Sequence, residues 1–272
     1  MTQNPLHLHA DIGIGGIHVR LHTDSQAYLD VIGERFAGFI ESVDRPDYEF
    51  DVSLVPPGNG AGEQVRVSRE GELWRVQRGD FLAEWDPRTR RGWIRQVLSP
   101  FSLDSVIRIV ITLVLAGEGG MLMHASSAIR NGRAFVFTGV SGVGKTTISR
   151  LAPADAHLLT DEMSFIRRDD DGGYRAFGTP FAGELAKPGE NLNAPLAGIF
   201  LLAQGPENRI DELSPTEAVR GLLANILFFA QDPELVKAIF DSAIALASRV
   251  PVRRLTFLPD TRVWELIGNE RA

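Results

Sequence analysis

Residues 139–147 read GVSGVGKTT, and this stretch decides how the rest of the chain is interpreted. It satisfies the pattern G-x-x-x-x-G-K-[ST], in which a glycine-rich turn wraps around phosphate oxygens. Glycine lacks a Cβ and tolerates positive φ, so the backbone amides of such a turn can point inward and form an anion-binding nest. A buried-strand pattern, RAFVFTG, precedes the motif and a helix-compatible segment follows it. The sequence therefore predicts a phosphate-binding loop (P-loop) between a strand and a helix that starts near Lys145.

The P-loop supplies the expected nucleotide contacts. Lys145 carries a positive charge that can reach the β- and γ-phosphates, and the Thr146 hydroxyl is placed to bind Mg²⁺. The expected ligands are ATP and Mg²⁺, although a loop that contacts phosphates does not distinguish ATP from GTP. The expected nucleotide-binding residues are Gly139, Ser141, Gly142, Val143, Gly144, Lys145, Thr146 and Thr147.

An acidic pair follows the P-loop in LLTDEMSFI, residues 158–166. Asp161 is predicted to be either the Mg²⁺ ligand or the general base, and Glu162 is the other candidate for these roles. The alternative is that one of the two carboxylates only caps a turn. Adjacent residues of a strand point to opposite faces, so both can serve one site only if the strand ends or bulges there.

Residues 1–99 are predicted to form a small α+β domain for recognition. The tryptophans Trp74, Trp85 and Trp93 are expected to form its core, a peptide-binding face that adds a strand at a free edge, or both. The predicted elements are strands within 8–23 around a Gly15–Gly16 turn, a helix at 27–40, a strand at 48–55, and an antiparallel meander of 64–67, 73–77, 81–85 and 92–97.

Residues 100–272 are predicted to form an α/β domain with a mixed sheet, and the boundary is placed near Ser99–Pro100 or just after the helix that follows. Asn131–Gly132 between two apolar runs predicts a hairpin directly before the P-loop. The predicted elements are helices at 103–115, 215–230, 233–249 and 262–267, and strands at 121–129, 133–138, 157–166, 174–177, 197–203 and 252–257.

Three segments, taken in order, resemble the HPr serine kinase family, which shares its fold with ATP-dependent phosphoenolpyruvate carboxykinase. They are MLMHASSAIRNGRAFVFTGVSGVGKTT at residues 121–147, LLTDEMSFI, and RRLTFLPDTRVWELI at residues 253–267. The last segment is similar to the closing strand and helix of the shorter relatives, which include kinases of lasso-peptide precursors. The Arg-Gly-Leu-Gly signature of true HPr kinases is missing between Gly178 and Ile199, so HPr itself is not the expected substrate.

This resemblance implies an ATP- and Mg²⁺-dependent kinase that phosphorylates a hydroxyl, most simply a serine of a peptide or small protein. The implied catalytic residues are Lys145, Asp161, Glu162 and His124, because His124 matches the family's Met-His-Gly position. HPr kinases assemble as oligomers, so a homo-oligomer is an open alternative, but no heptad pattern or unexplained apolar patch supports one here. The alternatives are a small-molecule kinase of the same fold and a regulatory module that binds a nucleotide without catalysis.

Composition limits the other function classes. The formal net charge of −7 and the lack of a basic stripe argue against a nucleic-acid partner. The chain contains no cysteine, shows no signal peptide and has no apolar run that is long enough to span a membrane, which favours a cytoplasmic protein without a membrane partner. The pairs His7/His9 and His18/His22 could bind a metal but are expected to be ordinary surface histidines, and Lys187 is expected to be a surface lysine rather than part of a closing loop.

Overall fold

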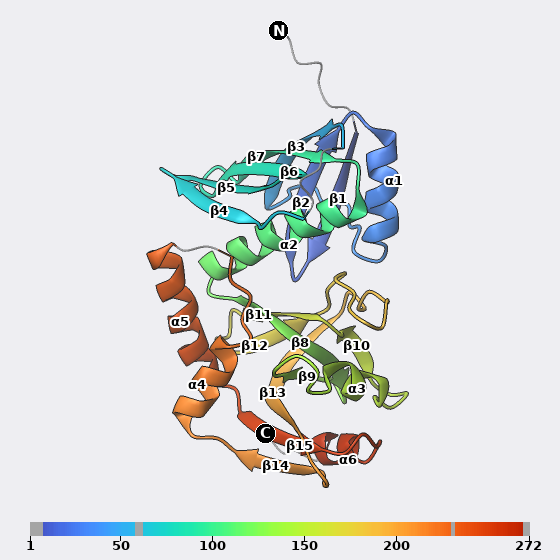
Figure 1. Cartoon of the computed structure of the whole chain (residues 1–272), viewed down its shortest axis with the longest axis vertical. Helices are drawn as coiled ribbons and strands as arrows, with labels where there is room; N and C mark the ends of the chain where they lie inside the picture. Colours follow the sequence, from blue (N-terminus) through green and yellow to red (C-terminus); the bar gives the residue numbers. More distant parts are fainter. Residues whose placement is uncertain (1–7, 58–61, 230–231, 269–272) are drawn as a thin grey trace. The chain divides into compact units, whose positions relative to one another are not determined.

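The computed structural model describes residues 8–57, 62–229 and 232–268 of the chain. These residues form two compact units (Figure 1). The first comprises Met1–Val114 with Phe228–Val236, and the second comprises Leu115–Leu227 with Lys237–Ala272. The division in the first half of the chain thus falls near the end of a helix and not at Ser99–Pro100.

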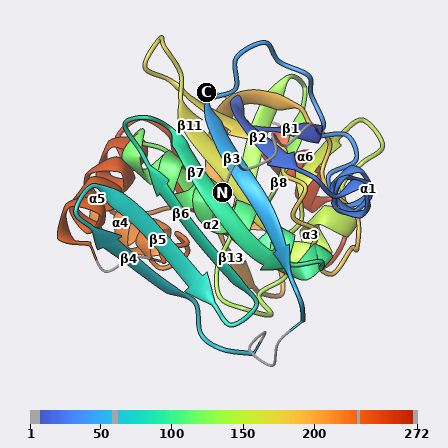
Figure 2. The ribbon, with the colours of Figure 1, turned by 90° about the horizontal axis from the view of Figure 1, so that it is seen from above.

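The first unit is built on a seven-stranded sheet with the order β1-β2-β3-β7-β6-β5-β4. The predicted meander is confirmed, because β4 to β7 pair in antiparallel succession. The parallel pairings of β3 with β2 and β7 were not predicted, and Figure 2 shows β3 beside β7. The strands are β1 (Leu8–Ile14), β2 (Ile17–Thr23), β3 (Tyr48–Val55), β4 (Arg66–Glu70), β5 (Leu73–Arg78), β6 (Phe81–Asp86) and β7 (Arg91–Val97).

Two of the tryptophans belong to the core of this unit. Trp74 and Trp85 are buried, and their rings stack with centroids 6.5 Å apart. Trp93 is only partly buried. The core interpretation is therefore confirmed for Trp74 and Trp85, whereas peptide addition at a free strand edge stays a prediction.

Helix α1 (Gln26–Arg35) ends earlier than predicted. The predicted helix continued to Ile40, but the chain leaves the helix at Phe36 and turns at Gly38, whose φ is +85°. Phe36 and Phe39 are both fully buried, and Ile40 forms a bridge to Ile12 of β1. The prediction was wrong at this end because Phe36 and Phe39, which fit helical spacing, are buried in the turn that follows the helix.

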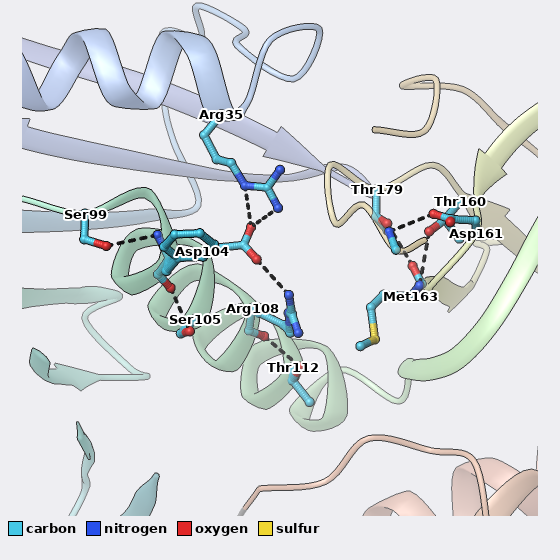
Figure 3. Close-up of polar contacts among 12 residues, drawn as sticks. Arg35, Ser99, Asp104, Ser105, Arg108, Thr112, Thr160, Asp161, Met163 and Thr179 are labelled. Carbon is cyan, nitrogen blue, oxygen red and sulfur yellow. Dashed lines mark hydrogen bonds and ion pairs between the residues drawn. The ribbon is translucent and has the colours of Figure 1, made fainter. Parts of the chain in front are cut away.

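Helix α2 (Pro100–Gly117) lies largely in the first unit. Asp104 accepts hydrogen bonds from Arg35 of α1 and from Arg108 one turn later, as Figure 3 shows. Ser102 donates to Asp80, a buried carboxylate that also binds Arg78. By length and composition α2 could cross a membrane, and 72% of its apolar window is buried inside the protein.

The second unit contains a mixed sheet in which five strands close on themselves. Going around this ring, β8 pairs with β9, β9 with β13, β13 with β12, β12 with β11, and β11 with β8. The sheet extends beyond the ring through β10, β15 and β14. The strands are β8 (Met121–Arg130), β9 (Arg133–Thr138), β10 (His157–Thr160), β11 (Met163–Arg168), β12 (Tyr174–Phe177), β13 (Asn193–Gln204), β14 (Arg209–Glu212) and β15 (Val252–Phe257).

The hairpin before the P-loop is confirmed. Strands β8 and β9 pair from Arg130↔Arg133 onward, and the turn residues Asn131 and Gly132 have φ of +52° and +72°. Two consecutive residues with positive φ give the backbone twist that a two-residue hairpin needs. On its other side β9 pairs with β13, which runs parallel to it, so the P-loop follows a strand that lies between antiparallel β8 and parallel β13.

Helices cover the second unit on both sides of the sheet through two apolar clusters. One cluster joins Ile148 of α3 and Trp264 of α6 to the aromatic side chains of β9 and β13, and the other joins α4 and α5 to the opposite face. The helices are α3 (Lys145–Arg150), α4 (Pro215–Leu223), α5 (Pro233–Ala247) and α6 (Val263–Gly268).

Helix α4 was predicted to continue to Ala230, which lies outside the described residues. The helix instead ends at Leu223, and Leu227 donates its N–H to Leu122 of β8 while Ile226 bridges Met123. The sheet edge thus takes the backbone groups that a longer helix would have satisfied internally. The start was easier to predict, because Ser214 and Glu217 form a capping box around Pro215.

Candidate functional site

The P-loop has the backbone conformation that its glycines permit. Gly139, Gly142 and Gly144 have φ of +145°, +77° and +117°, a region that residues with a Cβ rarely adopt. Helix α3 begins at Lys145, immediately after Gly144, as the sequence predicted. The side-chain amide of Gln204 donates to the Gly142 carbonyl at 3.1 Å and connects the loop to the end of β13.

We expect Gly144→Ala to weaken nucleotide binding strongly. A Cβ at this position would lie 2.7 Å from Cζ of the Phe257 ring and would also require an unfavourable positive φ. The loop would have to shift, and we expect the dissociation constant of Mg-ATP, measured by calorimetry, to rise at least about tenfold. Gly142→Ala is the matched control, because its φ is also positive but no atom lies within 4 Å of the added Cβ. Equal losses in both variants would show that the contact with Phe257 is unimportant.

Lys145 is buried at the base of the loop, with 7% of its surface exposed. Its Nζ donates to the carbonyl of Gly139 at 3.1 Å, and its own carbonyl accepts from the Ser126 hydroxyl of β8. Burial lowers the pKa of Lys145, and the nearby carboxylates Glu162 and Glu184 oppose this shift. The ammonium group is therefore held at the loop and faces an acidic neighbourhood.

Asp161 and Glu162 lie at a break between two strands. The predicted single strand 157–166 is wrong here: β10 ends at Thr160 and β11 begins at Met163. The Thr160 hydroxyl accepts the N–H groups of Glu162 and Met163, both at 3.1 Å, and this stabilises the bend. Figure 3 shows Asp161 at this bend beside Thr160, Met163 and Thr179. The break lets neighbouring carboxylates reach one site, as the sequence required.

The two carboxylates have different surroundings. Asp161 is 1% exposed, and its two oxygens accept the backbone N–H groups of Gly183 at 2.9 Å and Leu185 at 2.8 Å. The side chain of Glu162 is 32% exposed, and its Oε1 lies 3.7 Å from Nε2 of His124. Asp161 therefore fixes the segment around Gly183, whereas Glu162 presents its carboxylate more openly.

His124 occupies β8 beside the P-loop strand. Its N–H donates to the carbonyl of Asn225, and its carbonyl accepts from the Thr138 hydroxyl at the end of β9. Burial lowers the pKa of the imidazole, the charge of Lys145 lowers it further, and Glu162 raises it. The net direction is downward, so the neutral imidazole is favoured in the folded protein.

The lowered pKa of His124 has a consequence for stability. Since protonation is easier in the unfolded chain, His124 does not destabilise the fold above its ordinary pKa of about 6.5, and it costs stability as the pH falls below that value. We expect the free energy of unfolding, measured in urea at pH 5 and pH 8, to fall less for His124→Gln than for the wild type. His157→Gln, an exposed histidine paired with Glu190, is the control. An unchanged pH dependence in His124→Gln would contradict the assignment.

These groups surround one cavity of about 600 Å³ within the second unit. Two predicted residues are absent from its lining: Val143 packs against the apolar cluster that contains Ile148, and the carbonyl of Gly139 accepts a hydrogen bond from Lys145. Gly183 and Glu184 also line it and were not predicted, because no local pattern connects them with Asp161. The predicted residues in the lining are His124, Ser141, Gly142, Gly144, Lys145, Thr146, Thr147, Asp161 and Glu162.

The donor set at this cavity suits Mg²⁺. Thr146 and Asp161 offer hard oxygen atoms, and Mg²⁺ commonly uses only one or two carboxylates because phosphates and water complete its shell. No group of three histidine or acidic residues that could hold a metal by itself occurs within residues 8–57, 62–229 and 232–268.

The other candidate residues lie elsewhere. His7 lies outside the described residues, and His9 contacts the ring of His22 with centroids 6.0 Å apart. His18 lies near Glu41 and Asp47 in the first unit, and His22 near Glu49. Lys187 is exposed on the segment between β12 and β13 and does not line the cavity.

The second unit is thus a mixed-sheet α/β unit that presents a P-loop sequence and two carboxylates to one cavity. The family model described as SynChlorMet cassette protein ScmC matches residues 96–270, which is more than half of the chain. The chain belongs to the ScmC family of SynChlorMet cassette proteins. A search of curated proteins found no match.

Proposed function

We propose that this protein is an ATP- and Mg²⁺-dependent kinase that transfers the γ-phosphoryl group to a hydroxyl, with serine in a peptide or small protein as the acceptor. The observation that carries the proposal is the shared cavity of Lys145, Thr146, Asp161 and Glu162. Phosphoryl transfer requires positive charge at the phosphates, a metal and a base near the attacking hydroxyl. The residues of this cavity supply the positive charge and the base, and they can hold the metal.

Glu162 is the proposed base and Asp161 the proposed metal ligand. Both oxygens of Asp161 accept backbone N–H groups, which fixes its position, while the Glu162 carboxylate is more accessible from the cavity. The acceptor hydroxyl gives its proton to Glu162 as its oxygen forms a bond to the γ-phosphorus. The bond between that phosphorus and the β,γ-bridging oxygen breaks, and ADP leaves with the electron pair.

The remaining groups position the reactants. Lys145 neutralises charge on the β- and γ-phosphates, and Thr146 with Asp161 would hold Mg²⁺, which supplies further charge neutralisation when bound. Neutral His124 lines the same cavity, with its Nε2 3.7 Å from Oε1 of Glu162. A neutral imidazole adds no positive charge that would weaken Glu162 as a base.

Peptide serine as the acceptor rests on the sequence resemblance, so the test must also admit small molecules. Purified protein with γ-labelled ATP and Mg²⁺ is mixed with peptide, protein and metabolite fractions of a cell lysate, beside an Asp161→Asn control. Label in peptides or proteins as acid-stable phosphate, only with the wild type, supports the proposal. Label confined to metabolites would replace it with a small-molecule kinase, and ATP binding without any transfer would leave a regulatory module.

A further inference from the structure

A second hollow lies on the other side of the P-loop from the two carboxylates. Strands β9, β13 and β15 are parallel neighbours, so their carboxyl ends share one edge of the sheet. The P-loop follows β9, and on one side of it β8 leads to His124 and to the bend at Asp161. On the other side lie the ends of β13 and β15. In α/β sheets, ligands bind in crevices outside such carboxyl ends.

The ends of β13 and β15 are in direct contact with the P-loop. Gln204, the last residue of β13, donates its side-chain amide to the Gly142 carbonyl at 3.1 Å. Phe257, the last residue of β15, fills the space beside Gly144, where an added Cβ would come within 2.7 Å of its ring. The residues that follow these two strands in the sequence therefore start next to the P-loop in space.

Those following residues line a hollow of about 560 Å³ with a mixed chemistry. Leu258 and Leu266 are half-buried and offer apolar surface, and Arg262 and Glu265 of the α6 region are exposed at its wall. A guanidinium plane and leucine side chains suit the flat face of a nucleobase. A carboxylate can accept hydrogen bonds from ribose hydroxyls.

The wall of this hollow is held by a hydrogen-bond network. Asp260 accepts from Nε of Arg262 at 3.2 Å and from its Nη2 at 2.6 Å, and also from the side-chain amide of Asn208 at 3.2 Å. Asn208 in turn accepts the N–H of Leu258 at 2.9 Å. The guanidinium is thereby oriented before any ligand arrives, although Arg262 is 71% exposed.

We propose that this hollow, lined by Asn208, Leu258, Arg262, Glu265 and Leu266, binds the nucleoside of the nucleotide whose phosphates occupy the P-loop. The inference rests on the proposed function and deepens it. A γ-phosphate that faces Glu162 and Asp161 on one side of the loop directs the α-phosphate and the sugar to the other side. A nucleoside site beside the P-loop favours a nucleoside triphosphate over an inorganic polyphosphate as the ligand.

The test compares binding of Mg-ATP and Mg-tripolyphosphate by calorimetry with the full-length protein. We expect the wild type to bind ATP more tightly than tripolyphosphate, and Arg262→Ala to lose roughly tenfold in affinity for ATP with no change for tripolyphosphate. Lys145→Ala should weaken both ligands, because it acts at the phosphates. Arg254→Ala is the matched control, since Arg254 is an exposed arginine that faces Glu217 of α4.

A photo-crosslink provides an independent measurement. With 8-azido-ATP we expect labelled peptides to contain residues 206–208 or 258–266. Labelling confined to the segment 178–192, or equal affinity of the wild type for ATP and tripolyphosphate, would overturn this inference and leave the kinase proposal intact. A wild-type protein that binds neither ligand would overturn both.

Discussion

Glu162→Gln is expected to lower the rate of phosphoryl transfer on the order of 10²–10⁴-fold, the usual contribution of a general base. The amide keeps the shape of the side chain but accepts no proton from the acceptor. Since the Glu162 side chain is partly exposed and has His124 as its near neighbour at 3.7 Å, we expect the melting temperature to stay within about 2 °C of the wild type. Steady-state kinetics with labelled ATP and calorimetric binding of Mg-ATP measure the two effects.

Asp161→Asn is the matched variant, because it makes the same carboxylate-to-amide change one residue away. An amide nitrogen would face a backbone N–H of Gly183 or Leu185 where a carboxylate oxygen now accepts one. We therefore expect Asp161→Asn to lower the melting temperature as well as the rate. If Glu162→Gln retains near-wild-type turnover while Asp161→Asn is inactive but stable, Asp161 is the base and our assignment is reversed.

Gly189→Ala is expected to cause the largest loss of stability. A Cβ on Gly189 would lie 1.6 Å from the carbonyl oxygen of Leu159, a buried backbone group that cannot move aside. The segment would have to leave β10 and give up the bond from Gly189 to Thr179, and overpacking of this severity costs roughly 3 kcal/mol. We expect the melting temperature, followed by circular dichroism, to fall by roughly 10 °C.

The same substitution should also reduce activity, because this segment carries the N–H groups that hold Asp161. Gly117→Ala near the end of α2 is the control, since no atom lies within 4 Å of its added Cβ and alanine favours a helix. A Gly189→Ala protein as stable as Gly117→Ala would show that the segment between β12 and β13 is not held as described.

The features that the sequence predicted well are encoded locally. Asparagine and glycine adopt positive φ more readily than other residues. The Asn131–Gly132 turn and the P-loop glycines therefore made the hairpin and the start of α3 predictable. Adjacent residues of a strand point to opposite faces, so the sequence alone also showed that Asp161 and Glu162 can share a site only where the strand breaks. These signals place most of the cavity lining without any knowledge of long-range contacts.

The rest depends on contacts between distant residues. The backbone N–H of Gly183 donates a hydrogen bond to Asp161, which is 22 positions earlier in the sequence. A backbone contact of this kind gives no side-chain pattern from which it could be predicted. Strand β14 is short and polar, and it forms by pairing with β15, so it was missed. Helices α1 and α4 end early because Ile40 forms a bridge to Ile12 and Ile226 forms a bridge to Met123. These tertiary contacts override the helical spacing of the apolar residues.

The division of the chain bears on its synthesis. The first unit includes Phe228–Val236, and Arg69 of β4 pairs with Glu234 in this segment at 3.4 Å. A ribosome delivers residues in order and nascent domains generally fold as units. The first unit therefore receives its last segment only after residues 115–227 of the second unit have emerged, so the two units are synthesised in an interleaved order.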